Sequence, residues 1–478
     1  MKKDKQPNPK FSTRSDEKPA EAANGFFEIL SGVQHRLDEA FERLPAYTAP
    51  PLDEAAAAVL DHVATRLHDN YPYAHPLYAG QMLKPPHPVA RAAYTLAMSV
   101  NPNNHALDGG RASSAMEMEA VAALAGMFGW SQHLGHLTSG GTFANLEALW
   151  IAGQLAPGKT IIASEQAHYT HSRICGVLGL PFASIPSDDT GHIDLHALEA
   201  MLQTQKIGTV VVTLGTTAIG AVDPLNEILK LQERYSFRVH VDAAYGGYFT
   251  LADNLSPQAR AAFDAIPQAD SIVVDPHKHG LQPYGCGCIL FRDPAVGSFY
   301  THDSPYTYFS SKDLHLGEIS LECSRAGASA VALWATQQLL PYTPGGAFAR
   351  DLESSREAAL ELHRRLGASR HFVAPAFAPE LDIVFWAAKT SSIEASSALA
   401  QRIFDEAAGR DLHLALAHLP ARFFPAGTWP QAQETAKVTC LRSVLMKPEH
   451  LLWIDEIWRR LEAANSTARA VNTSLAVG

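Results

Sequence analysis

The sequence has 478 residues, of which 46% are hydrophobic and 18% charged, which is enough to build a large folded core. Its formal net charge of -11 disfavours nucleic acids and anionic membranes as partners, because both select clustered Lys and Arg. Its five scattered cysteines, without a CxxC pair, argue against a disulfide framework or a structural zinc site and favour a reducing, cytoplasmic location.

The first part of the chain predicts a tail followed by helices. Residues 1–24 mix charged residues, Pro, Ser and Asn with little apolar content, so we predict a disordered tail that is too polar for a secretory signal. Residues 25–84 carry apolar residues at three- and four-residue steps, which predicts a helical N-terminal segment suited to dimerisation. No stretch has the roughly 18 consecutive apolar residues that a membrane helix needs.

The rest of the chain predicts two further domains. Residues 85–340 alternate helices with short strands that are apolar on both faces, which is typical of a mostly parallel α/β sheet flanked by helices. A Pro/Gly break at 341–346 precedes a smaller α+β domain, so that this domain covers residues 341–478. The strands expected in the larger domain are 160–164, 182–186, 209–215, 238–244, 271–275 and 286–291.

One motif suggests a nucleotide-driven ATPase. Residues 153–160, GQLAPGKT, match the GxxxxGK[ST] pattern of a phosphate-binding loop. Such a loop needs a strand before it and a helix after it, so that backbone N–H groups face the phosphates. Here the preceding LEALWIAGQL is helical and the following TIIAS predicts a strand. The reversed order disfavours the ATPase, which is the alternative from a different functional class.

The stretch VVDPHKHGLQPYGCGC, residues 273–288, offers either a metal site or a reactive lysine. His277, His279, Cys286 and Cys288 are potential ligands, but the two pairs lie on separate sides of a Gly/Pro turn, and Cys is a common buried hydrophobe. We therefore predict no metal. Lys278 follows an apolar strand, and desolvation beside cationic neighbours lowers a lysine pKa and frees the amine for a Schiff base.

A Schiff-base lysine suggests pyridoxal 5'-phosphate (PLP), which has three further requirements. Asp242 ends a β-branched strand among small residues and supplies an acid for the pyridine nitrogen. The stretch Ser139–Thr142 starts a helix with two glycines, where free N–H groups and the helix dipole favour a phosphate. His168 follows the strand 160–164 and offers a flat ring for stacking.

Six motifs carry a resemblance to a known family, and it extends from about His75 to the C-terminus. Together they resemble the group II PLP-dependent amino-acid decarboxylases, most closely the tyrosine/aspartate type. The resemblance implies PLP-dependent transferase-like fold type I, with a mostly parallel seven-stranded sheet and a homodimer whose active sites lie at the interface. In chain order the motifs are TSGGTFANL, SEQAHYTHSRICGVLGL, LGTTAIGAVDPL, HVDAAYGG, ADSIVVDPHKHG and CSRAGASAVALW.

The same resemblance implies the reaction and the cofactor contacts. An L-amino acid loses CO2 through an external aldimine and a quinonoid to give the amine, with an aromatic substrate such as tyrosine slightly favoured over aspartate or glutamate. Lys278 forms the internal aldimine, Asp242 pairs with the pyridine nitrogen, and His168 and Ala244 flank the ring. The remaining cofactor contacts implied are Gly140, Gly141, Thr142 and His277 at the phosphate and Thr217 near the 3-hydroxyl.

On the substrate side the resemblance implies that Arg325 binds the carboxylate. His75 and Tyr78 are expected at the mouth of the site, and a loop tyrosine, Tyr306 with Tyr308 as the alternative, returns a proton to carbon. A phenylalanine at that loop position would favour an aldehyde-forming decarboxylase.

Two questions stay open at this point. The nearest alternative function is a sphingosine-phosphate-lyase-like carbon–carbon lyase, which needs a second cationic site for a phosphorylated substrate. His279 stands where the family has a bulky apolar residue, and the sequence gives no reason for it.

Overall fold

The computed structural model describes residues 19–301 and 316–475, apart from residues 46, 48, 49, 432 and 434. The chain forms two compact units, residues 1–57 and 58–478. The first unit contains α1 (Pro19–Glu39), so the last residues of the expected tail are helical. Helix α2 (Glu54–Leu67) begins in the first unit and ends in the second, and none of its residues is buried.

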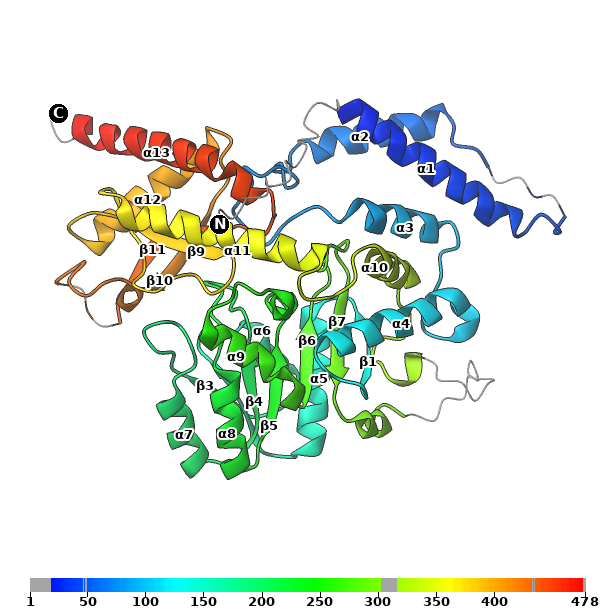
Figure 1. The fold of residues 1–478 in the computed structure, drawn as a ribbon, viewed down its shortest axis with the longest axis horizontal. Helices are drawn as coiled ribbons and strands as arrows, with labels where there is room; N and C mark the ends of the chain where they lie inside the picture. Colours follow the sequence, from blue (N-terminus) through cyan, green and yellow to red (C-terminus); the bar gives the residue numbers. More distant parts are fainter. Residues whose placement is uncertain are drawn as a thin grey trace, which may run out of the picture. The chain divides into compact units, whose positions relative to one another are not determined.

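A seven-stranded sheet forms the centre of the second unit, with strand order β1-β7-β6-β5-β4-β2-β3 (Figure 1). Strand β7 is antiparallel to its neighbours β1 and β6, and the pairs among β6, β5, β4, β2 and β3 are parallel. The prediction of a mostly parallel seven-stranded sheet is confirmed. The strands are β1 (Leu134–Thr138), β2 (Thr160–Ser164), β3 (Phe182–Ile185), β4 (Ile207–Thr213), β5 (Arg238–Asp242), β6 (Ser271–Val274) and β7 (Gly287–Phe291).

Helices flank this sheet on both faces (Figure 1). Helix α5 is buried along most of its length, which explains why LEALWIAGQL is apolar all round. It ends at Leu155, and β2 starts at Thr160, so the GQLAPGKT motif joins a helix to a strand and the phosphate-loop reading is wrong. The helices are α3 (Pro88–Met98), α4 (Arg111–Met127), α5 (Gly141–Leu155), α6 (Thr170–Leu178), α7 (Leu195–Thr204), α8 (Leu225–Tyr235), α9 (Pro257–Asp264) and α10 (Gly327–Leu339).

The C-terminal part carries a second, antiparallel sheet with strand order β10-β11-β9-β8. Helix α11 connects it to the first sheet, because Phe348 and Leu352 pack in the core of the large sheet while Leu362 and Leu366 pack in that of the small one. The elements are α11 (Ala347–Ala368), β8 (Phe372–Val373), β9 (Ile383–Ala388), α12 (Ile393–Ala408), β10 (Ala415–Pro420), β11 (Lys437–Val444) and α13 (His450–Leu475).

Residues 77–79 pack with the small sheet, although the sequence groups them with the N-terminal helices. Leu77 and Ala79 belong to its hydrophobic core, and the Ala79 N–H donates to the His413 carbonyl at 2.9 Å. None of the helices in the described ranges is long and apolar enough to cross a membrane.

Candidate active site

The carboxyl ends of β4, β5 and β6 open into a pocket of about 470 Å³. In a parallel sheet this edge is where ligands bind, because strand ends and helix N-termini converge there. All nine residues expected to contact PLP line the pocket: Gly140, Gly141, Thr142, His168, Thr217, Asp242, Ala244, His277 and Lys278.

Asp242 is the last residue of β5 and is held by two hydrogen bonds. The His171 Nε2 lies 2.9 Å from Oδ2, and the Ala244 N–H donates to Oδ1 at 3.1 Å. Burial raises the pKa of Asp242, but His171, Lys278 and the Ala244 N–H together outweigh burial and leave this pKa well below its usual range. A carboxylate that stays ionised in a buried position suits the protonated nitrogen of a pyridine ring.

Lys278 lies in a turn that directly follows β6 and presents its amine to the pocket. Its Nζ is 3.1 Å from Oδ2 of Asp275, and its own N–H donates to the Asp275 carbonyl at 2.9 Å. Asp275 is 2% exposed, so its charge needs this ammonium as a partner. Asp275 therefore positions the lysine as well as shaping the turn.

The start of α5 forms a cradle that only glycine permits. A Cβ built at Gly141 lies 2.6 Å from Asp275 Oδ2, and one built at Gly287 of β7 lies 2.5 Å from the Gly140 carbonyl carbon. The first N–H groups of a helix have no partners within the helix and bind anions. With the Thr142 hydroxyl beside them, these groups fit the phosphate of PLP.

His168 and His277 supply two imidazoles to the same pocket. Burial lowers the pKa of His168, and its Nδ1 contacts the Thr170 hydroxyl. Burial also lowers the pKa of His277, whose Nδ1 donates to the Cys286 carbonyl at 2.7 Å. Both rings are therefore neutral at pH 7, as a stacking ring needs to be beside a cationic pyridinium.

The four potential metal ligands of the 273–288 stretch do not converge. His277 bonds to a backbone carbonyl, and Cys286 and Cys288 are buried in the core of the large sheet. His279 has no exposed surface, and its Nε2 lies 3.2 Å from Asp382 Oδ2. Among the residues that the structure describes, no group of three or more His, Cys, Asp or Glu side chains is placed to hold a metal ion.

His279 thus acquires a structural explanation. It packs edge-on against Tyr245 and Phe249, with ring centroids 4.8 and 5.0 Å away. The Tyr245 hydroxyl donates to Asp382 Oδ1 at 2.5 Å, so Asp382 is shared by His279 and Tyr245. A polar residue is tolerated at this buried position because the small domain supplies a carboxylate opposite it.

The expected substrate residues lie elsewhere. The Arg325 Nη1 donates to Glu117 Oε1 at 2.7 Å and also contacts the Leu137 carbonyl, and the guanidinium does not line the pocket. His75 packs on Trp453, and Tyr78 packs among Tyr71, Tyr73 and His413. Tyr306 and Tyr308 lie outside the described residues.

Further residues at the site were not anticipated: Tyr245 and Asn145 line the pocket, and His171 contacts Asp242 without lining it. His171 lies three residues after His168, and Tyr245 lies three residues after Asp242, so each was within the quoted motifs. Asn145 lies one helical turn after Gly141. Its Nδ2 donates to the Gly141 carbonyl at 2.8 Å, and its Oδ1 accepts from His240 Nε2, also at 2.8 Å. Helical spacing from the glycine pair could have identified Asn145.

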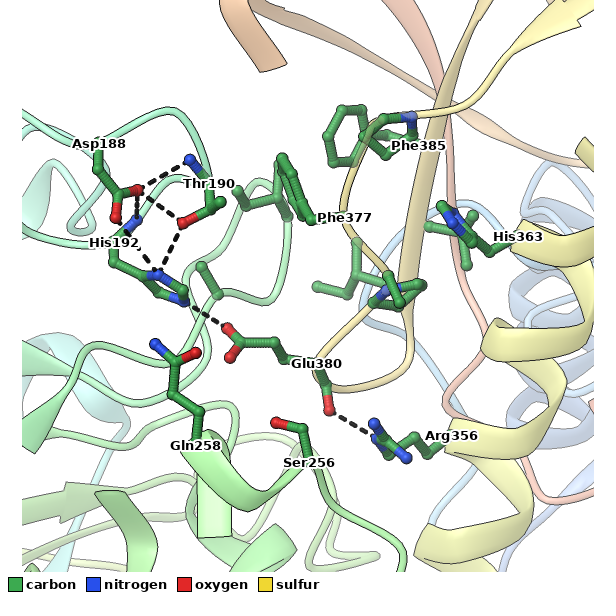
Figure 2. A pocket seen from close by; sticks show the side chains of 17 residues that line it. Asp188, Thr190, His192, Ser256, Gln258, Arg356, His363, Phe377, Glu380 and Phe385 are labelled. Atoms are coloured by element: carbon green, nitrogen blue, oxygen red, sulfur yellow. Dashed lines mark hydrogen bonds and ion pairs between the residues drawn. The ribbon is translucent and has the colours of Figure 1, made fainter. Parts of the chain in front are cut away.

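A second pocket of about 310 Å³ lies between residues 188–192, the start of α9 and residues 375–385. Figure 2 shows His192 between Asp188 and Glu380, with Arg356 reaching the Glu380 backbone. His192 Nε2 is 2.7 Å from Glu380 Oε2, and Arg356 Nε donates to the Glu380 carbonyl at 2.8 Å. These charged groups are bonded to one another, and the lining of this pocket includes neither a lysine nor a pair of glycines at a helix start.

The fold and the first pocket together define a PLP-dependent enzyme of fold type I. The model of the pyridoxal-dependent decarboxylase conserved domain matches residues 151–387. A probable L-tyrosine/L-aspartate decarboxylase of Methanothermobacter thermautotrophicus is 30% identical over 265 residues, which cover 54% of this chain and 69% of the relative. The chain therefore belongs to the group II PLP-dependent amino-acid decarboxylases.

Other comparisons agree with this family. The L-tyrosine decarboxylase of Enterococcus faecium is 29% identical over 465 residues, covering 74% of this chain and 76% of that protein. Mouse CSAD superposes with a TM-score of 0.74 at 19% identity over 93% of this chain and 99% of that one. Oryza sativa TDC, solved with PLP and tryptamine, superposes with a TM-score of 0.72 at 18% identity over 94% and 96% of the two chains. At these identities the two structures establish the fold alone.

Proposed function

We propose that the substrate of this decarboxylase is an aromatic L-amino acid, with tyrosine favoured, and that the products are the corresponding amine and CO2. The observation that carries the proposal is one pocket lined by Lys278, the glycine cradle and Asp242, which His171 contacts from outside the lining. The names of the bacterial and archaeal relatives support tyrosine or aspartate as the substrate.

The lining supports an aromatic side chain. Phe143, Tyr245 and Tyr284 line the pocket beside the polar cofactor contacts. Aspartate or glutamate needs a further cation for its side-chain carboxylate, and a retro-aldolase needs one for a phosphate. Among the described lining residues Lys278 is the one Lys or Arg, so both alternatives are less favoured than an aromatic amino acid.

The roles proposed for the residues follow from the site. Bound PLP supplies an electron sink for the electron pair released when CO2 leaves. The Lys278 amine holds the cofactor between turnovers, Asp242 keeps a proton on the pyridine nitrogen, and His168 and Ala244 confine the ring. The first turn of α5 and His277 bind the phosphate, and Thr217 contacts the opposite edge of the ring.

The proposal also covers the residues that the pocket does not include. Tyr306 is proposed to return the proton to carbon. Tyr306→Phe is expected to shift the product from amine to aldehyde, with dissolved O2 as the oxidant and ammonia and H2O2 released beside CO2. We further propose a cytoplasmic homodimer, because α2 exposes Val59, Leu60, Val63 and Leu67 by 45–62%, and such a stripe is usually covered by a partner. Analytical ultracentrifugation of the purified protein tests the dimer.

The decisive experiment is a screen of the common amino acids for CO2 release and amine formation. The wild-type protein is expected to be yellow and to act on aromatic amino acids, and Lys278→Ala is expected to lose both colour and turnover. Lys206→Ala, which removes an exposed lysine, is the matched control and is expected to keep both. Cleavage of a phosphorylated amino alcohol without CO2 release from any amino acid would show a retro-aldolase instead.

A further inference from the structure

A small cavity of about 170 Å³ adjoins the turn that carries Lys278, and none of its lining residues belongs to the PLP pocket. His279 and Leu281 of that turn form one wall, and α11 contributes Asp351 and Leu352. Residues 84–88 and 447–449 close the cavity. Two lysines, Lys84 and Lys447, and two acids, Asp351 and Glu449, thus line one space.

The two lysines are desolvated and only partly satisfied. Lys447 is 3% exposed, and its Nζ donates to the Tyr78 carbonyl at 2.6 Å. The Lys84 Nζ donates to the Met446 carbonyl at 3.2 Å. Burial lowers the pKa of Lys447 to about 7 and that of Lys84 to about 8. An ammonium has three donors, so each lysine keeps donors for a further acceptor.

The two acids lie at the exposed side of the same cavity. Asp351 and Glu449 are both exposed residues, and burial of part of the Asp351 side chain raises its pKa. In the part of the chain that the structure describes, no ion pair joins either acid to Lys84, Lys447 or another cation. Two lysines inside and two acids at the rim therefore face one space and interact across it without a direct ion pair between them.

His279 adds an unsatisfied polar group to the wall. Its ring has no exposed surface, and its Nδ1 has no hydrogen-bond partner among the described residues. On the opposite side its Nε2 contacts Asp382, which accepts the Tyr245 hydroxyl, and Tyr245 lines the PLP pocket. The cavity and the PLP pocket are thus joined by three side chains in contact.

We infer that this cavity is a second binding site for a small zwitterionic amino acid. Its carboxylate lies between the Lys84 and Lys447 ammonium groups, and its ammonium faces Asp351 and Glu449. Leu281, Phe348 and Leu352 pack against its short side chain. A simple anion leaves the two acids unmatched, and a simple amine leaves the two lysines unmatched, so the zwitterion satisfies the charges best.

The pocket of Figure 2 provides the contrast. There His192 contacts Asp188 and Glu380, so its charges are neutralised before any ligand arrives. The lysines and acids of the Lys84 cavity interact only across its space, without a direct ion pair among the described residues. The inference concerns binding alone and does not depend on the proposed substrate.

Isothermal calorimetry on the holoenzyme tests the site after borohydride reduction has fixed the cofactor to Lys278. The probes are L-alanine, propionate and ethylamine, which share a small apolar body and differ in their charged groups. L-alanine is expected to bind, propionate to bind about tenfold more weakly, and ethylamine not to bind. Equal affinity for propionate and L-alanine would overturn the zwitterion, and absence of heat with L-alanine would overturn the site.

Two variants separate a binding role from a structural one. Lys84→Met is expected to weaken L-alanine and propionate alike by about 10- to 100-fold, because it removes a donor to the carboxylate. Glu449→Gln, at the exposed rim, is expected to weaken L-alanine to the level of propionate and to leave propionate unchanged. The control Lys206→Met is expected to leave all three probes unchanged.

Lys447 is kept intact in these experiments, because its ammonium holds the Tyr78 carbonyl and its removal threatens folding. L-alanine affinity that does not change in Lys84→Met would overturn the site. If Glu449→Gln weakens the binding of L-alanine and propionate equally, the proposed contact between the ligand ammonium and Glu449 is wrong. Because calorimetry needs no turnover, these outcomes are independent of those of the amino-acid screen.

Discussion

Two buried histidine–carboxylate pairs distinguish the PLP pocket from the pocket of Figure 2. In the PLP pocket, His171 Nε2 lies 2.9 Å from Asp242, and the carboxylate still borders the open space. In the pocket of Figure 2, His192 Nε2 lies 2.7 Å from Glu380, which also accepts the Val222 N–H at 2.7 Å. In the first pair, His171 supports a carboxylate that faces the pocket. In the second pair, the carboxylate of Glu380 uses its hydrogen bonds to join two parts of the chain.

The electrostatic consequences differ in the same way. Burial raises the pKa of Asp242, but His171, Lys278 and the Ala244 N–H together hold it below its usual range, which provides a negative charge for a cationic ring. Burial lowers the pKa of His192, but Asp188 and Glu380 outweigh burial and raise that pKa to about 10. The lesson is that a charged pair marks a ligand site when one partner keeps unused hydrogen-bonding capacity toward a cavity.

The largest expected effect comes from removing the charge that faces the cavity. Asp242→Asn keeps the shape of the side chain but cannot hold a proton on the pyridine nitrogen, so we expect kcat to fall by about 10²–10³-fold at saturating PLP. Glu380→Gln is the matched control, because it makes the same chemical change beside the other histidine. Steady-state decarboxylation assays compare the two variants.

Glu380→Gln is expected to keep kcat near the wild-type value and to lower the midpoint of thermal unfolding instead. A loss of kcat in Glu380→Gln as large as that in Asp242→Asn would remove the distinction between the two pairs. A normal kcat in Asp242→Asn would remove the proposed role of Asp242.

A smaller effect is expected where the cradle meets the lysine turn. In Gly141→Ala the new Cβ approaches Asp275 Oδ2 at 2.6 Å, so the turn or the start of α5 has to shift, at a cost of about 1–3 kcal/mol. We expect PLP affinity to fall by about tenfold, measured by titrating the apoprotein with PLP.

Gly176→Ala is the control, because a Cβ there meets nothing within 4 Å in the middle of α6. It is expected to leave PLP affinity unchanged and to stabilise the protein by up to about 1 kcal/mol. Wild-type PLP affinity in Gly141→Ala would show that the cradle tolerates a side chain.

The site residues that the sequence predicted share one property: the sequence pattern on either side of each residue was enough to predict its position. Asp242 and Lys278 follow apolar strands, and Gly141 starts a helix, so parallel-sheet geometry alone brings them to one edge. Strand β1 was missed because its sequence, LGHLT, lacks a run of branched apolar residues. In addition, its partner residues in β7 lie at least 149 residues later in the chain.

What the sequence could not predict depends on contacts between distant segments. The ion pair between Arg325 Nη1 and Glu117, 208 residues away, could not be predicted, and the assignment of Arg325 to the substrate stays a prediction. His279 had no explanation until Asp382 of the small domain was found opposite it, and His171 was hidden because its partner Asp242 lies 71 residues later. Tertiary pairing of this kind leaves no periodic signal in the sequence.

The smallest expected effect on activity, and the clearest pH dependence, belongs to His192. His192→Gln is expected to keep kcat and to lower the free energy of unfolding by about 1–3 kcal/mol at pH 6, because it removes a cation that two acids contact. The folded-state pKa of about 10 lies above the ordinary value of 6.5. The stabilisation by His192 is therefore complete below about pH 6.5 and is lost as the pH rises through about 10.

Urea unfolding of the wild-type protein and His192→Gln at several pH values measures this difference. It should be largest near pH 6 and should shrink toward zero near pH 10. The exposed His196→Gln variant is expected to follow the wild-type protein at every pH. A difference that stays constant with pH would mean that His192 acts through packing, and a fall in kcat would mean that the pocket of Figure 2 is coupled to catalysis after all.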